Sequence, residues 1–199
     1  MIEDGTLRFY ADNAASYARH RSQPTGAPLE TFLAALPAGA RILELGCGNG
    51  IDAESMLVRG FDVDATDGTP GLVAEAQTRI GARARLMRFD ALDASADYDG
   101  VWACASLLHV PASELTEILS RIRTALRPRG VFVASFKGGT GEGFDALGRY
   151  YNYPTPANLE AAYRAAQWQD LSLTVNMGTG YDAVPTQWLW MTARREEAE

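Results

Sequence analysis

The sequence predicts an α/β fold in which helices cover both faces of a mostly parallel sheet. From residue 41 onward, short apolar runs typical of strands alternate with longer segments of helical periodicity. A helix between two strands provides the crossover that parallel strands require. A glycine-rich turn follows the first strand, as in the ligand-binding turns of such sheets.

The residues before this alternation predict a helical cap over positions 1–37. Apolar residues at helical spacing indicate one helix over residues 7–20 and a second over residues 29–36. Proline and glycine interrupt the chain between them at residues 23–28, and Pro37 ends the second helix.

Five segments after the cap have the short apolar runs that are typical of buried strands. They are residues 41–45, 61–66, 83–89, 100–104 and 131–136. Three helices are expected between them, over residues 51–59, 70–80 and 112–126. Thr69-Pro70 is a favourable start for the second of these helices.

The end of the chain has a different pattern. After an expected helix over residues 157–167, two segments at 171–175 and 187–193 alternate apolar and polar residues with only a loop between them. This pattern predicts an antiparallel hairpin at the sheet edge. The sequence thus predicts one domain, with a core over residues 38–193 and a frayed charged tail over 194–199.

Composition excludes several classes of function. A chain of 199 residues with 47% hydrophobic residues suits one globular domain, and its net charge of −7 argues against nucleic-acid binding. The two cysteines and two histidines have no metal-site or disulfide spacing. No apolar run reaches the ~20 residues of a membrane span, and no leader pattern opens the chain, so we expect a cytoplasmic protein without membrane or metal partners.

The turn after the first strand predicts a site for a nucleoside cofactor. Gly46, Gly48 and Gly50 let the backbone pass close to a ligand, and the following helix offers free N–H groups. Asp67 comes 21 positions after Gly46, where its carboxylate can accept hydrogen bonds from both hydroxyls of a ribose. The alternatives are a tight turn without ligand and an N-cap role for Asp67.

These residues resemble the class I S-adenosylmethionine-dependent methyltransferases, most closely small bacterial enzymes of the tellurite-resistance or ubiquinone-pathway type. The motifs that carry the similarity are residues 44–50, Asp67, residues 89–91, residues 98–102 and the helix exit 126–131. The resemblance implies a Rossmann-like, seven-stranded sheet with a reversed last strand. It also implies S-adenosyl-L-methionine as cofactor, S-adenosyl-L-homocysteine as product, and in-line methyl transfer to a small-molecule acceptor.

The same resemblance implies a set of cofactor-binding residues. They are Tyr17, Glu44, Gly46, Cys47, Gly48, Gly50, Asp67, Gly68, Asp90, Ala91 and Ala105. Glu44 would receive the cofactor's ammonium group, or else accept from nearby backbone donors. Asp90 would accept from the adenine amino group while the Ala91 N–H binds a ring nitrogen; the alternative for Asp90 is an ordinary turn acid. Gly68 would flank the adenine, and Ala105 would border the sulfur.

The cap is expected to contribute a lid. Tyr10 and Tyr17 lie seven residues apart on one face of the first helix. In related enzymes, aromatic residues of an N-terminal helix close over the cofactor, which makes Tyr17 the expected lid residue. Packing alone is the alternative for this pair. Arg21 is a candidate for the cofactor's carboxylate or, equally, a solvated side chain.

No catalytic residue is assigned from the sequence, and the candidates are His109, Tyr150 and Tyr151. His109 titrates in the range of a general base, but in its apolar surroundings packing is the alternative. Arg149 and the two tyrosines offer a cation with aromatic walls for a small anionic or planar acceptor, or simply anchor a loop. The glycine-rich residues 137–143 predict a lid or a surface loop.

Two other functions share part of this pattern. A non-catalytic S-adenosylmethionine-binding or regulatory protein would retain the same fold. An NAD(P)-dependent oxidoreductase would normally have a glycine three positions after Gly48, where this chain has Ile51. In each case we expect a monomer or homodimer.

Overall fold

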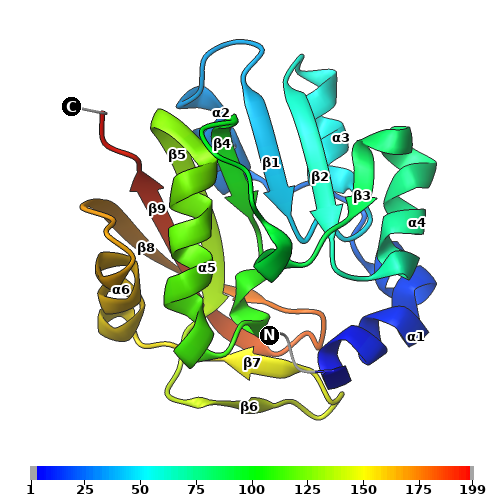
Figure 1. Ribbon diagram of the computed structural model, residues 1–199. Helices are drawn as coiled ribbons and strands as arrows, with labels where there is room; N and C mark the ends of the chain where they lie inside the picture. Colours follow the sequence, from blue (N-terminus) through cyan, green and yellow to red (C-terminus); the bar gives the residue numbers. More distant parts are fainter. Residues whose placement is uncertain (1–3, 198–199) are drawn as a thin grey trace.

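The computed structural model describes residues 4–197, and within them seven strands form one sheet in the order β3-β2-β1-β4-β5-β9-β8 (Figure 1). The strands are β1 Arg41–Leu45, β2 Asp62–Asp67, β3 Ala84–Leu86, β4 Tyr98–Ala103, β5 Leu126–Lys137, β8 Asp170–Thr179 and β9 Pro185–Arg194. Strands β1 to β5 run parallel, whereas β9 pairs antiparallel with both β5 and β8. The predicted mostly parallel sheet with a terminal hairpin is therefore confirmed.

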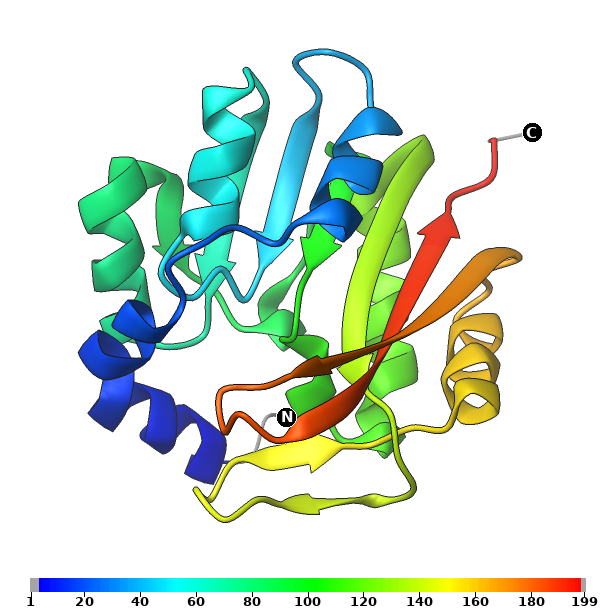
Figure 2. The same cartoon turned by 180° about the vertical axis from the view of Figure 1, so that it is seen from behind.

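Helices cover both faces of the sheet. They are α1 Asp4–His20, α2 Ala27–Ala34, α3 Ile51–Val58, α4 Pro70–Ile80, α5 Ala112–Ala125 and α6 Pro156–Ala165. Figure 1 shows α5 and α6 in front of the sheet, and Figure 2 shows α2 and α3 in front from the opposite side. Among the described residues, no helix has the length and apolar character needed to cross a membrane.

The core consists of two layers, one on each face of the sheet. Leu43 of β1 and Val101 of β4 are fully buried in the layer under α5 and α6. Their neighbours Ile42 and Trp102 are fully buried in the layer under α2, α3 and α4. Because successive side chains of a strand point to opposite faces, each strand contributes to both layers.

Two strand boundaries differ from the expected ones. The strand expected at 131–136 begins at Leu126, directly after α5, because Leu126 already pairs with Tyr98 of β4, and the register shifts before Val131 pairs with Gly100. The segment expected as a strand over 83–89 is a strand only over Ala84–Leu86. A 3₁₀ turn, η2 Phe89–Ala91, follows and changes the direction of the side chains after it.

The tail also begins later than expected. Arg194 ends β9, and Arg195 exchanges backbone hydrogen bonds of 2.9 Å with Arg129 and Gly130. Arg129 takes a φ of +65° in this pairing, a left-handed conformation that is uncommon for residues other than glycine. Residues 198–199 of the predicted tail lie outside the described part of the chain.

The glycine-rich segment after β5 contains secondary structure that the sequence pattern did not predict. Strand β6 Glu142–Phe144 pairs with β7 Tyr150–Asn152 in a separate two-stranded sheet beside α1 (Figures 1 and 2). The Oδ1 atom of Asp145 accepts the backbone N–H groups of Leu147 and Arg149, at 2.9 Å each, and so stabilises the turn between the strands. The segment is therefore neither a simple loop nor an unsupported lid.

Candidate active site

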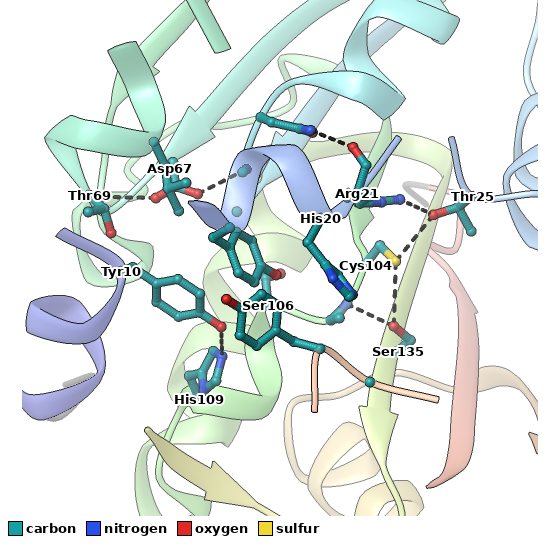
Figure 3. Close-up of a pocket in the computed structure, with 18 of the residues that line it drawn as sticks. Tyr10, His20, Arg21, Thr25, Asp67, Thr69, Cys104, Ser106, His109 and Ser135 are labelled. Atoms are coloured by element: carbon teal, nitrogen blue, oxygen red, sulfur yellow. Dashed lines mark hydrogen bonds between the residues drawn. The ribbon is translucent and has the colours of Figure 1, made fainter. Parts of the chain in front are cut away.

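A cavity of about 600 Å³ lies at the carboxyl ends of β1, β2 and β4. Helix α1 and the β8–β9 hairpin bound it on opposite sides (Figure 2), and Figure 3 shows part of its lining. In open α/β sheets, ligands bind at this edge, where the strand order reverses. The volume falls within the ~300–1,000 Å³ range of small-molecule sites.

The glycine turn after β1 brings bare backbone to the cavity. Gly46 has a φ of +79°, and a Cβ placed on it would lie only 2.4 Å from the Cβ of Ser106. Gly48 has a φ of +57°, and a Cβ there would have Tyr17 as its nearest neighbour at 3.9 Å. A side chain at position 48 would therefore occupy the space in which a ligand can approach the main chain.

Asp67 ends β2 and holds this turn in place. Its two carboxylate oxygens accept the backbone N–H groups of Gly48 at 3.0 Å and Thr69 at 2.9 Å. Thr69, not Asp67, is the N-cap residue of α4. Burial raises the pKa of Asp67 to about 6, although these hydrogen bonds oppose the rise. Each oxygen keeps acceptor capacity on the side of the cavity, as a ribose site requires.

The fully buried Asp52 holds the segment after α1 in place beneath the cavity. Its carboxylate pairs with Arg21 at 2.7 Å and accepts the backbone N–H of Thr25 at 2.7 Å. It also accepts Nε1–H of Trp102 at 3.0 Å. Nδ2 of Asn49 donates to two backbone carbonyls at the end of α1 and just beyond it. Arg21 therefore lines the cavity as part of an ion pair, not as a free cation.

His109 and Tyr10 form a directional hydrogen-bonded pair at the cavity wall (Figure 3). Nδ1 of His109 lies 2.6 Å from the backbone oxygen of Tyr150, and a carbonyl can only accept, so Nδ1 carries the proton. Burial lowers the pKa of His109 to about 4, which leaves the ring neutral at pH 7. Nε2 therefore accepts the hydrogen bond from the Tyr10 hydroxyl, 2.9 Å away.

Aromatic rings from distant segments meet over the cavity. Tyr17 lies between Tyr10 and Tyr181, with ring centroids 5.0 and 5.1 Å away, and His20 is 4.8 Å from Tyr181. Tyr181 lies in the loop between β8 and β9, where the sequence has no periodic pattern. It was therefore not recognised from the sequence, because its position depends on how the hairpin extends past the sheet.

The lining also includes side chains of β9 and of the turn after β4. Trp188 and Trp190 of β9 are only partly buried and line the cavity. Cys104 is half-buried in the lining, with its Sγ 3.4 Å from Thr25 Oγ1 (Figure 3). They also pack against the core, Trp188 against the layer under α5 and α6, and Trp190 and Cys104 against the layer under α2, α3 and α4.

The structure brings some of the expected cofactor residues to the cavity and leaves others outside. Its lining contains Tyr17, Gly46, Gly48, Asp67, Gly68 and Ala105. It does not contain Glu44, Cys47, Gly50, Asp90 or Ala91. Cys47 is buried, and a Cβ on Gly50 would meet Ala76 of α4 at 3.2 Å, so both residues support the turn from the far side.

Glu44 lies beneath the turn and not at the cavity. It is 2% exposed within β1, and burial raises the pKa of its carboxyl group well above the ordinary range. The nearby charge of Asp52 raises the pKa further, and a hydrogen bond from the Ala53 backbone opposes the rise. Among the described residues, Oε2 of Glu44 has no hydrogen-bond partner, so both expected roles of this side chain stay predictions.

Asp90 does not reach the cavity either. Its side chain is exposed and lies 3.4 Å from Nε of Arg88. The η2 turn buries Phe89 against the cavity and directs Asp90 and the exposed Ala91 toward solvent. The expected adenine contact of these two residues is therefore corrected, and Phe89 is the residue of this turn that lines the cavity.

Tyr150 and Tyr151 lie behind His109 and are not part of the lining. They are 8% and 3% exposed, and the Tyr151 ring lies 4.6 Å from that of His109. The other face of this cluster contains two cations, with Lys137 Nζ 4.7 Å and Arg149 Cζ 5.2 Å from the Tyr151 centroid. The expected direct contact with an acceptor is wrong for both tyrosines in this cavity; Tyr150 contributes through its backbone carbonyl.

Fold and cavity together define a Rossmann-like protein with a site for a nucleoside cofactor beside an aromatic chamber. The methyltransferase-domain family matches residues 42–130 of the chain. The 1,6-didemethyltoxoflavin-N1-methyltransferase of Burkholderia thailandensis, crystallised with 1,6-didemethyltoxoflavin and S-adenosylhomocysteine, is similar with a TM-score of 0.72 and 26% identity. This similarity covers 96% of this chain and 88% of that chain.

Two curated proteins are also similar in sequence. The ubiquinone biosynthesis O-methyltransferase of Xanthomonas axonopodis pv. citri (strain 306) is 34% identical over 101 residues, which are 47% of this chain and 41% of that protein. Hemagglutinin 1 of Eikenella corrodens is 27% identical over 129 residues, 62% of this chain and 43% of that protein. The chain thus matches less than half the length of these relatives. The chain is thus similar to class I S-adenosylmethionine-dependent methyltransferases in its sheet order, its glycine turn and the sequence of residues 42–130.

Proposed function

We propose that the protein binds S-adenosyl-L-methionine in this cavity and catalyses methyl transfer to a small-molecule acceptor. When bound, this cofactor supplies a methyl group on a positively charged sulfur. One observation carries the proposal: the Asp67 carboxylate and the bare backbone at Gly48 line the same cavity as the aromatic rings of Tyr17 and Tyr181. We further propose a single-domain cytoplasmic protein, monomeric or homodimeric, that does not bind nucleic acid.

The residues present suit the cofactor at each of its parts. Asp67 would accept hydrogen bonds from the ribose hydroxyls, and Gly68 and Phe89 would flank the adenine. The turn at Gly46 and Gly48 would receive the methionine portion. These assignments are supported by the open acceptor capacity of the carboxylate and by the space that a Cβ at position 48 would fill.

The chain's own contribution would be to align the reactants and exclude water. Helix α1 and the β8–β9 hairpin meet through Tyr17 and Tyr181 and cover the cavity between them. Of the three candidate catalytic residues, His109 remains, because it lines the cavity and presents a neutral imidazole. Tyr10 stands between Nε2 of His109 and the cavity, so any proton from an acceptor would reach the imidazole through this hydroxyl.

Calorimetric titration with S-adenosylhomocysteine tests the cofactor assignment. Asp67→Ala is expected to weaken binding by about 1–3 kcal/mol, the usual effect of losing hydrogen bonds to a charged group. Asp90→Ala is the matched control, since the structure leaves that carboxylate in solvent, and its affinity should equal that of the wild type. The assignment would be contradicted if both variants lost the same amount of binding free energy, or if a folded Asp67→Ala protein lost none.

The second candidate function is non-catalytic S-adenosylmethionine binding. It is supported by the fact that His109 is the one catalytic candidate that reaches the lining of the described cavity. Release of S-adenosylhomocysteine in an acceptor screen separates the two functions. Cofactor binding without product release from any acceptor would favour the regulatory alternative. Binding of NADH in place of S-adenosylhomocysteine would support the oxidoreductase, which the family match and reversed strand disfavour.

A further inference from the structure

One part of the cavity lining, which we call the aromatic end, lacks a free charge. Rings of this aromatic end come from α1, the β8–β9 loop and β9. They belong to Tyr10, Tyr17, Tyr181, Trp188 and Trp190. Among the lining residues that the structure describes, the side chains with a full charge at neutral pH are Asp67 and Arg21. Both lie at the turn end, and Arg21 is neutralised by Asp52 at 2.7 Å.

The cations nearest to the aromatic end are outside the lining. Arg149 is 1% exposed and pairs with Asp145 at 2.7 Å, while Lys137 is 6% exposed and lies 3.5 Å from Asp182. Neither side chain contributes an atom to the cavity wall. An anionic acceptor would therefore be desolvated at the aromatic end without a counter-charge, which is strongly unfavourable.

A cationic acceptor is disfavoured for a different reason. The Cζ atom of Arg149 lies 5.0 Å from the ring centroid of Phe9 and 5.4 Å from that of Tyr181. A permanent positive charge thus already interacts with the ring of Tyr181 from outside the cavity. Because Asp145 neutralises Arg149, the repulsion that a cationic acceptor would meet at the aromatic end comes from the cofactor's own sulfonium.

One polar group of the aromatic end has a fixed direction. The carbonyl of Tyr150 accepts from Nδ1 of His109, and Nε2 of His109 accepts from the Tyr10 hydroxyl. The Tyr10 proton is thereby committed to His109. Burial keeps the pKa of Tyr10 well above its ordinary value, so the hydroxyl stays neutral. The Tyr10 oxygen can then only accept hydrogen bonds, and the Arg149 guanidinium already interacts with it from outside the lining.

We propose that the methyl acceptor is an uncharged, planar aromatic or heteroaromatic molecule that donates an O–H or N–H hydrogen bond to Tyr10. This inference rests on the proposed function and names its substrate class. The flat rings of Tyr17, Tyr181 and the two tryptophans provide stacking surfaces, and Tyr10 selects for a donor. His109 is a positioning residue in this scheme, because it acts by orienting the Tyr10 hydroxyl.

The test uses the 199-residue chain saturated with S-adenosylhomocysteine, to which four naphthalene probes are titrated with calorimetry as the readout. The probes are 2-naphthol, 2-methoxynaphthalene, 2-naphthyl phosphate and 2-naphthylmethylamine, which present a neutral donor, no donor, an anion and a cation on one scaffold. We expect 2-naphthol to bind about tenfold more tightly than each of the others, the effect of one hydrogen bond to a buried acceptor.

A pair of matched variants isolates the contribution of Tyr10. Tyr10→Phe should remove the preference of naphthol over its methyl ether and leave S-adenosylhomocysteine affinity within twofold of the wild type. Tyr163→Phe is the control, because that buried hydroxyl of α6 has no hydrogen-bond partner and lies outside the lining. The Tyr163→Phe protein should keep the wild-type preference for naphthol over its methyl ether.

Three results would overturn the inference. They are tighter binding of the phosphate or the ammonium probe, equal binding of the naphthol and its ether to the wild type, and no naphthol binding at all. If S-adenosylhomocysteine still binds in these cases, the acceptor class is wrong while the cofactor site stands. Failure of the wild type to bind S-adenosylhomocysteine would instead overturn the proposed function.

Discussion

The hydroxyl of Tyr10 lies 2.9 Å from Nε2 of His109, although 99 residues separate the two in the chain. This contact connects α1 with the short η3 helix, Leu107–His109, that follows β4. A second contact supports it, since Thr6 Oγ1 of α1 accepts the backbone N–H of Tyr150 at 2.7 Å. The N-terminal helix is thus part of the wall of the cavity and contributes directly to its chemistry.

The protonation state of His109 gives a direct prediction. We expect ¹⁵N NMR to show the Nδ1–H neutral imidazole at pH 7 and a titration midpoint near 4, because burial disfavours the charged ring. The unfolded chain gains this proton near pH 6.5, so folding loses up to about 3 kcal/mol as the pH falls from 6.5 to 4. A midpoint above 6 or the Nε2–H tautomer would contradict the hydrogen-bond directions.

The pH dependence of cofactor binding should be controlled by Asp67. Its pKa of about 6 means that the carboxylate becomes protonated below pH 6 and can then accept fewer hydrogen bonds. We expect S-adenosylhomocysteine affinity to fall up to tenfold per pH unit below about 6, as measured by calorimetry. In Asp67→Asn, affinity should be lower at neutral pH and nearly flat across this range. If the affinity of Asp67→Asn still falls with decreasing pH, a group other than Asp67 controls the pH dependence.

The titration of Asp67 also changes the stability of the fold with pH, in the opposite direction to that of His109. A carboxyl group with a raised folded pKa favours folding at low pH, and this contribution is lost as the pH rises from 3.8 to 6. The pH ranges over which Asp67 and His109 change the free energy of unfolding overlap, so their effects on global stability partly cancel. Titrations of the individual residues are therefore the informative measurement.

The close approach at Gly46 predicts a steric effect. In Gly46→Ala, the added methyl group would lie 2.4 Å from the Cβ of Ser106 and the residue would keep a φ of +79°. We expect a loss of about 2–4 kcal/mol in the free energy of unfolding, from overpacking and backbone strain together. Chemical denaturation measures it. In the double variant Gly46→Ala/Ser106→Gly, only the part of the lost stability that comes from overpacking should be regained. If the losses of the two single variants simply add in the double variant, the two side chains are not in direct contact.

The buried Asp52 predicts a local effect on the cap. Asp52→Ala leaves the Trp102 indole and the Thr25 backbone without an acceptor, so we expect a loss of about 2–4 kcal/mol and faster amide exchange around residues 21–26. Glu54→Ala is the control on the same helix, because its ion pair with Arg79 is partly exposed and worth less than about 1 kcal/mol. Similar amide exchange rates in Asp52→Ala and Glu54→Ala would show that Asp52 does not stabilise the position of the cap.

The parts of the fold that follow from local pattern were predictable. The alternation of apolar runs and helices gave the parallel sheet, and the polar alternation over residues 171–193 gave the antiparallel hairpin. The β6–β7 pair was missed because three-residue strands have too little periodicity to detect. Arg129 shows a further limit, since a residue other than glycine takes a left-handed φ there.

The candidate site was predictable only where sequence neighbours determine position. Gly46, Gly48 and Asp67 follow directly from strand ends, and all three line the cavity. Asp90 also follows a strand, but a 3₁₀ turn of three residues directs it to solvent. One turn of backbone is enough to reverse a side chain, and propensities do not specify such a turn.

The sequence by itself determined which strands end in glycine or aspartate, because strand and helix periods are local properties of the chain. The tertiary structure decided which distant side chains share the cavity. Tyr10 meets His109, Tyr181 covers Tyr17, and the rings of Tyr150 and Tyr151 turn behind the wall. Those outcomes depend on how α1 and the hairpin dock against the sheet, and docking is set by packing between segments that no local pattern relates.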